Sequence, residues 1–139
     1  MPLHLLKMCV GIADIEELAA AQRRRFKAER RICHYTRNMP KRASELLDGG
    51  SLYWIIRGQI RVRQRLKAIQ RHTDDDGWTG CALVLDRKLV PTLPKPMRAM
   101  QGWRYLEADS APLDLLAAVG KGDDLPPKLV AELRALGLL

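Results

Sequence analysis

The longest alternation of apolar and polar side chains in this chain runs over residues 51–67 (SLYWIIRGQIRVRQRLK). Its even positions are mostly apolar, whereas five of its odd positions are Arg or Lys. A two-residue period is that of a β-strand, so the pattern predicts one long strand, or two strands in continuous register, with an apolar face and a cationic face. A straight strand of this length spans roughly 50 Å, so we expect it to bend or coil, with Gly58 as the place.

A helix is predicted after a buried strand over residues 3–12. Asp14 is a suitable N-cap, and Glu17 three residues later completes a capping-box pattern. Four side chains at helical spacing predict the face that docks on the sheet: Ile15, Leu18, Gln22 and Phe26. Six cations lie in the nine residues 23–31, which is more than the helix dipole alone explains.

The remaining pattern predicts an alternation of short strands and helices. We expect strands over residues 32–37, 81–86 and 101–106, a loop or edge segment over 89–96 with its three prolines, and helices over 40–47, 113–119 and from 124 onward. Residues 72–77 (HTDDDG) predict a hairpin turn in which the three Asp are solvated. A helical interpretation also stays open for Val62, Leu66 and Ile69, which have the spacing of one helix face.

These elements predict an α+β fold with a bent, mostly antiparallel, barrel-like sheet flanked by helices. At 139 residues the chain suits one domain with an ordinary core. We expect residues 1–112 to form this domain and residues 113–139 to form a helical extension packed on it.

Charge is unevenly distributed along the chain. The net charge is +8, but residues 20–72 hold fifteen Lys and Arg against three acidic residues, a local excess of +12. From residue 105 onward, three bases face six acids. The asymmetry favours a polyanionic partner for the first part, and a solvated surface that keeps the protein soluble is the alternative.

Cysteine usage and hydropathy predict the compartment. Cys9, Cys33 and Cys81 are widely spaced and form no C-x-x-C motif, which is typical of a reducing cytosol. The apolar run at the start is too short for a signal peptide, and no window approaches a membrane span. We therefore expect a soluble, cytoplasmic protein without a membrane partner; its oligomeric state stays open.

Few residues suggest catalysis. The possible nucleophiles and bases are His4, His34, His72, Ser44, Ser51 and Ser110, and none lies in a G-x-S-x-G frame. Cys33 and His34 are adjacent, but neighbours on a strand point to opposite faces. No phosphate loop, zinc spacing or calcium loop is present. We expect no catalytic residue, metal or cofactor, and the sequence favours a binding module over an enzyme.

Cations beside aromatics remain as candidate chemistry, because Arg and Lys neutralise phosphates and aromatic faces stack on unpaired bases. The candidate nucleic-acid-binding residues are Arg37, Lys41, Arg42, Tyr53, Arg57, Arg61, Arg63, Arg65, Lys95, Arg98, Trp103 and Arg104. Core packing is an equally good interpretation of Trp103.

Short strings along the chain resemble an uncharacterised bacterial family, the domain of unknown function 1489. They are residues 2–5 (PLHL), 36–37 (TR), 40–42 (PKR), 50–54 (GSLYW), 63–64 (RQ), 83–86 (LVLD) and 101–106 (QGWRYL). The resemblance covers about residues 1–115 and leaves the tail outside. It implies a small cytoplasmic-type protein and brings no activity.

The order of elements also looks like that of the PUA, ASCH and EVE group of small β-barrels, which bind RNA or a modified base. The leading hypothesis is therefore an RNA-binding module that uses the cationic strand face, with RNA, including structured or modified RNA, as its partner. The alternative is a protein or enzyme that binds a phosphorylated small molecule or modified base in an Arg-lined pocket. A third hypothesis is an interaction module that meets an acidic protein.

Overall fold

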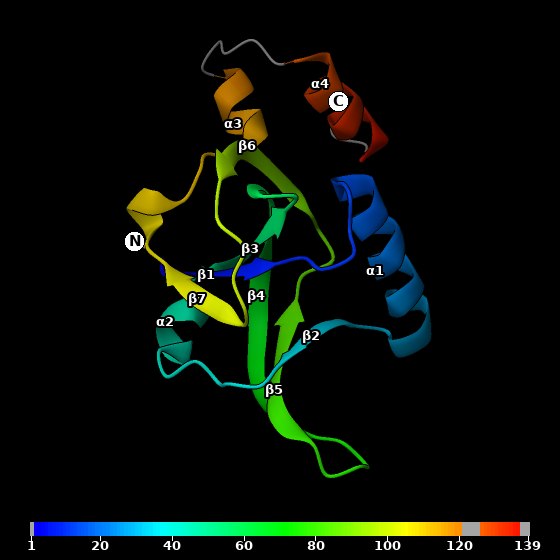
Figure 1. Cartoon of the computed structure of the whole chain (residues 1–139), viewed down its shortest axis with the longest axis vertical. Coiled ribbons are helices and arrows are strands. Elements are labelled where there is room, and N and C mark those ends of the chain that lie inside the picture. Colours follow the sequence, from blue (N-terminus) through cyan, green and yellow to red (C-terminus); the bar gives the residue numbers. More distant parts are fainter. Residues whose placement is uncertain (1, 121–125, 137–139) are drawn as a thin grey trace.

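The computed structural model describes residues 2–120 and 126–136. Its elements are β1 (His4–Met8), α1 (Ile15–Glu29), β2 (Ile32–Thr36), α2 (Ala43–Leu47), β3 (Ser51–Ile56), β4 (Gln59–Thr73), β5 (Thr79–Leu85), β6 (Val90–Pro96), β7 (Trp103–Leu106), a 3₁₀ turn (Ala108–Ser110), α3 (Leu115–Gly120) and α4 (Pro127–Ala135). Figure 1 shows α3 and α4 at one end of the molecule and the tip of the β4–β5 hairpin at the other.

The seven strands form one sheet, ordered β2-β5-β4-β3-β1-β7, with β6 also paired to β4. Only β1 and β3 pair in parallel; the other pairs are antiparallel. Within the described part of the chain, the outer strands β2 and β7 do not pair with each other, so the sheet is open. The α+β class is confirmed and the closed, PUA-like barrel is not.

The 51–67 segment is a hairpin and not one continuous strand. Arg57 and Gly58 have φ of 49° and 79°, and two successive residues in this left-handed region reverse the chain tightly. The sequence predicts a bend at Gly58. The structure has a full reversal of the chain there, between β3 and β4. The helical interpretation of Val62, Leu66 and Ile69 is wrong, since all three lie on β4.

Strand β4 pairs with three neighbours because it is long. Its first half lies between β3 and β6, and its second half pairs with β5. The register shifts near Ile60 and again between Leu66 and Ala68. A β-bulge adds one residue to a strand, so the side chains beyond it point to the opposite face.

Two hydrophobic cores lie on opposite faces of the sheet. The first core contains Leu5, Leu52, Trp54, Val62 and Leu66 from the strands, with Ile15, Leu18 and Ala19 from α1. The second contains Leu6, Tyr53, Ile55, Ile60 and Leu106. The predicted alternation is therefore correct over residues 62–66, but Ile60 lies on the opposite face to Val62 because of the bulge.

Helix α1 begins and docks as its sequence predicts. The Asp14 carboxylate accepts a hydrogen bond from the Glu17 backbone N–H at 2.8 Å, and Glu17 accepts one from the Ala13 N–H at 3.0 Å. Ile15, Leu18 and Gln22 are buried against the sheet. The helix covers the face of the first core (Figure 1). Arg23, Arg24 and Lys27 in its second half are exposed.

A buried amide network fastens α1 to the sheet. Gln22 and Gln64 exchange hydrogen bonds at 2.8 and 2.7 Å, and Gln64 also accepts from the Trp54 indole N–H at 2.9 Å. The second amide hydrogen of Gln64 is donated to the Asp86 carbonyl at 2.9 Å. Gln64 has no exposed surface, and each of its amide hydrogens and its oxygen has a partner.

The tail elements pack on the sheet through a third cluster, in which Leu115 of α3 meets Leu129 and Leu133 of α4, with Leu93 of β6 against them. The predicted short helix and terminal helix are confirmed as α3 and α4. The predicted start of the terminal helix at residue 124 lies outside the described residues. The division into a domain of residues 1–112 and an extension stays a prediction.

Replacing Gln64 with Leu should lower the free energy of unfolding by about 3 kcal/mol or more, because the Trp54 indole, the Gln22 amide and the Asp86 carbonyl all lose a buried partner. Urea unfolding measures the change. Gln70→Leu, on an exposed part of the same strand, is the matched control and should change it by less than about 0.5 kcal/mol. Equal losses in both variants would contradict the network.

Candidate nucleic-acid interface

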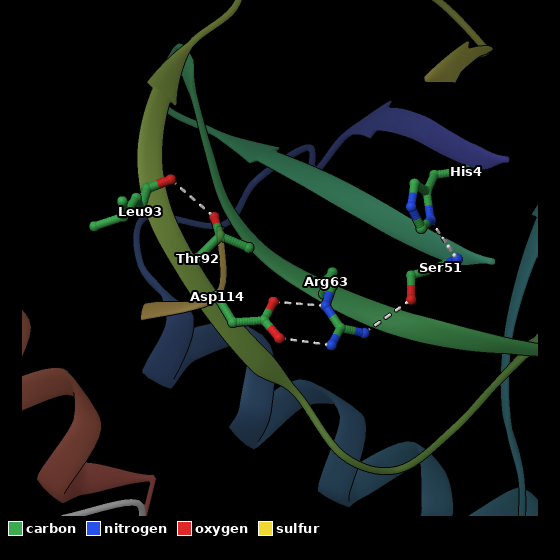
Figure 2. A network of polar contacts seen from close by, with 6 residues as sticks. All are labelled: His4, Ser51, Arg63, Thr92, Leu93 and Asp114. Atoms are coloured by element: carbon green, nitrogen blue, oxygen red, sulfur yellow. Dashed lines mark hydrogen bonds and ion pairs between the residues drawn. The ribbon is translucent and has the colours of Figure 1, made fainter. Parts of the chain in front are cut away.

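Two cations of the predicted cationic face of β4 are paired with acids of the protein itself. Arg61 is 7 % exposed and forms an ion pair with Glu132 of α4. Arg63 donates two hydrogen bonds to the Asp114 carboxylate at 2.7 and 2.8 Å, and a third to Ser51 Oγ at 3.0 Å. Figure 2 shows the Arg63 guanidinium held between Asp114 and Ser51. Arg61 and Arg63 are therefore not offered to a polyanion, which corrects the sequence expectation.

The aromatic candidates also have structural partners. Tyr53 is 4 % exposed and packs edge-on against His4 at 4.9 Å, so its ring is not accessible to a base. Trp103 is half-buried, and its indole N–H donates to the Asn38 carbonyl at 2.8 Å. Tyr105 accepts a hydrogen bond from the Arg42 backbone N–H at 3.1 Å. These rings attach the loop before α2 to β7, as the core-packing alternative expects for Trp103.

The other predicted cations divide into engaged and free groups. Arg42 pairs with Glu45 at 2.6 Å and with Glu107 at 3.6 Å, and Lys95 donates to the Ser110 carbonyl. Six candidates are exposed and have no carboxylate within ion-pair distance among the described residues: Arg37, Lys41, Arg57, Arg65, Arg98 and Arg104.

Two of these free cations line one groove. Arg98 and Arg104 face a groove of about 700 Å³ beside Gly58, together with Met97 and Met100. Arg57 precedes Gly58 in the hairpin turn. Arg37 and Trp103, which the small-molecule alternative places beside Arg104 in one pocket, do not line this groove.

A second groove, which we call the α1 groove, has a denser cationic lining. It measures about 610 Å³ and lies between the outer side of α1 and the loop after β5. Four of its lining residues are cations: Arg23, Lys27, Arg87 and Lys88. None has a carboxylate within ion-pair distance in residues 2–120 and 126–136. Asp86 is the one acidic residue in the described lining.

Phe26 forms the aromatic part of the α1 groove. The Arg87 guanidinium lies 3.8 Å from the centre of its ring, and that of Arg30 lies 5.6 Å from it. A guanidinium on an aromatic ring is held flat by dispersion and by the ring quadrupole. The groove thus combines free positive charge with an ordered planar cation.

The sequence alone gave only part of this groove. The run of cations at 23–31 was visible as an excess over what the helix dipole explains, but none of these residues was among the candidates. Sequence reasoning missed Arg87 and Lys88 because they lie about sixty residues after the cations of α1 along the chain. Only the packing of α1 across β4 and β5 brings the two segments together.

The chain matches the model of one protein family, described as "Protein of unknown function (DUF1489)", over residues 5–139. The protein belongs to this family. The match extends through α3 and α4, so the tail is part of the DUF1489 family pattern, in contrast to the expected limit near residue 115. No curated protein and no solved structure matches the chain. Among the described residues of this DUF1489 protein, no helix has the length and apolar character to cross a bilayer.

The adjacent Cys33 and His34 do not support a nucleophilic pair. Burial raises the pKa of the Cys33 thiol, which leaves it protonated and unreactive at neutral pH. Burial, followed by the charges of Lys7 and Arg25, lowers the pKa of His34 to about 4. His34 is therefore a neutral imidazole at pH 7.

The Arg61–Glu132 pair gives a direct test of how the tail is attached. Glu132→Leu should lower the free energy of unfolding by about 3 kcal/mol, because it leaves a buried guanidinium without its counter-ion. The double variant Arg61→Leu/Glu132→Leu should regain most of this loss, since a buried apolar pair needs no counter-charge. Urea unfolding measures both, and a double variant no more stable than Glu132→Leu would contradict the pairing.

The His34 pKa predicts a pH dependence of stability. His34 binds a proton below pH about 6.5 in the unfolded chain, but only below about 4 in the folded chain. The free energy of unfolding therefore decreases by about 3 kcal/mol as the pH falls through this window. His34→Phe should remove this component, measured as the difference in unfolding free energy between pH 7 and pH 4. An equal pH difference in the variant and the parent would contradict it.

Proposed function

We propose that this DUF1489 protein binds RNA in the α1 groove. The observation that carries the proposal is the set of four cations that line this groove without a carboxylate partner among the described residues. Arg61 and Arg63 of β4, by contrast, are paired with acids of the protein itself, and the groove beside Gly58 has two cations in its lining, Arg98 and Arg104. A cluster of cations without carboxylate partners in the fold can bind an external anion, and the phosphates of RNA are such anions.

Single-stranded RNA suits the groove better than a duplex. An unpaired strand exposes its base faces, which stack on Arg guanidinium planes as well as on aromatic rings. The Arg87 guanidinium lies over the Phe26 ring, 3.8 Å from its centre, and offers such a plane beside the phosphate-binding cations. Apart from Asp86 and Gln22, whose amide is already bonded to Gln64, the polar side chains of the groove are the four cations that contact phosphates and stack on bases, so binding with little sequence preference follows.

The proposal includes a soluble, cytoplasmic protein, as the sequence predicts. The proposed site lies on the opposite side of the sheet from the β4 face that the sequence favours. Arg63 and Arg65 share a face with Tyr53 and Ser51. Helix α1 lies over the other face, on Trp54 and Leu52.

Binding to a single-stranded RNA oligonucleotide should weaken with salt. If the four groove cations each neutralise one phosphate, log affinity falls against log salt with a slope of about −3. The variant Arg23→Glu/Lys27→Glu should bind at least about tenfold more weakly and bring the slope to about −1. Fluorescence anisotropy of a labelled oligonucleotide measures both quantities.

The matched control is Arg57→Glu/Arg65→Glu, which makes the same charge change at exposed positions outside the α1 groove. It should retain nearly the parent affinity. Equal weakening in the two variants would show that net charge, and not the groove, carries binding. Tighter binding of polyglutamate than of RNA at equal charge would favour the acidic-protein hypothesis instead.

A further inference from the structure

A cavity of about 250 Å³, which we call the inner pocket, lies between α1 and the sheet. Residues from the end of β1, from α1, from β2 and from β3 line it. It shares Gln22 and Ile32 with the α1 groove and otherwise lies along a different side of α1, which contributes Leu18, Ala21 and Arg25 here. Neither the sequence analysis nor the family match assigns this pocket.

The aromatic wall of the inner pocket is held rigidly. The Trp54 indole N–H is bonded to Gln64, and the His34 ring stands perpendicular to the indole with centroids 5.2 Å apart. The apolar residues Ile12, Leu18 and Leu85, which belong to the first core or pack against it, form much of the remaining lining. A fixed aromatic surface in an apolar cavity suits a flat, apolar ligand body.

The polar groups of the inner pocket are cationic or neutral. Lys7 and Arg25 line it, and its described lining contains no carboxylate. Lys7 is in register with Trp54, so its side chain starts beside the indole. Arg25 Nη1 donates to the Cys33 carbonyl at 3.0 Å, which places the guanidinium at the β2 side. Gln22 has its amide engaged with Gln64.

Two further observations favour an anion in this pocket. Burial is the largest cause that lowers the pKa of Lys7, so its ammonium has lost part of its hydration, and the described residues provide no carboxylate within ion-pair distance. His34 Nε2 is buried and has no hydrogen-bond partner in the described part of the chain. A buried imidazole nitrogen normally has a partner, and a ligand oxygen or hydroxyl would supply one.

We propose that the inner pocket binds a small monocarboxylate with a flat apolar body. The carboxylate lies between Lys7 and Arg25, where one of its oxygens accepts a hydrogen bond from His34 Nε2, and the apolar body packs against Trp54. A volume of 250 Å³ is just below the range typical of drug-sized ligands, so the ligand is smaller than these. A phosphate ester is less suitable, because its charge of about −1.5 to −2 at pH 7 costs more to move from water into a mainly apolar pocket than the single charge of a carboxylate.

This inference goes beyond RNA binding and is independent of it. It uses Lys7, Arg25 and His34, whereas the proposed RNA site uses Arg23, Lys27, Arg87 and Lys88. A variant that abolishes binding at one site therefore still allows binding at the other site to be measured.

Three matched probes test the ligand class: phenylacetate, its neutral analogue phenylacetamide, and phenyl phosphate. The readout is the ¹H–¹⁵N signal of the Trp54 indole, titrated with each probe on the full chain and assigned with Trp54→Phe. We expect phenylacetate to shift this signal with a dissociation constant on the order of 1 mM, which is typical of a ligand of this size, and to bind at least about tenfold more tightly than the other two. Equal binding of the amide, or tighter binding of the phosphate, would overturn the proposal.

Lys7→Gln should weaken phenylacetate at least about tenfold and leave phenylacetamide unchanged. The matched control Lys67→Gln removes the same charge from an exposed position on β4 and should change neither. Ala21→Leu, which narrows the cavity without altering charge, should weaken both probes and remains informative if Lys7→Gln does not fold. Parent-like binding in Lys7→Gln or in Ala21→Leu would place the probe elsewhere and reject the inner pocket.

Discussion

Gln64 is the point at which four segments of this protein are fastened together. Its amide bonds α1 through Gln22, β3 through Trp54, and the loop after β5 through Asp86, while its own backbone belongs to β4. In a buried site an amide that lacks one partner is costly, so this geometry permits only one placement of α1 over the sheet. Both the α1 groove and the inner pocket depend on that placement, because each uses α1 as a wall.

The C-terminal segment has a definite electrostatic relation to β4. Asp114, just before α3, and Glu132, on α4, neutralise Arg63 and Arg61, two cations only two residues apart on one strand. Two acidic residues of the tail thus neutralise two cations of the strand that the sequence predicts to be the binding surface. The family match through residue 139 agrees with a tail that belongs to the fold and completes it.

The ion pairs inside the fold restrict which cations remain available to external anions. With Arg61 and Arg63 paired, the unpaired cations of the α1 groove and the partly dehydrated Lys7 are the clearest sites for external anions among the described residues. The two sites differ in chemistry. The groove is open and strongly cationic, which suits a chain of phosphates, whereas the inner pocket is mainly apolar and suits one small acid.

The sequence by itself determined most of the secondary structure, because caps and periodicity are local: Asp14 and Glu17 begin α1. It marked Gly58 as the place of a bend, but it did not show that the chain reverses there completely, between β3 and β4. It could not determine which face Arg61 takes, since two bulges on β4 break an alternation that is regular in the sequence. It also could not show that Asp114 and Glu132 meet β4, or that Arg87 meets Phe26. Those contacts join residues more than fifty positions apart, and only the packing of the complete chain brings them within a few ångströms.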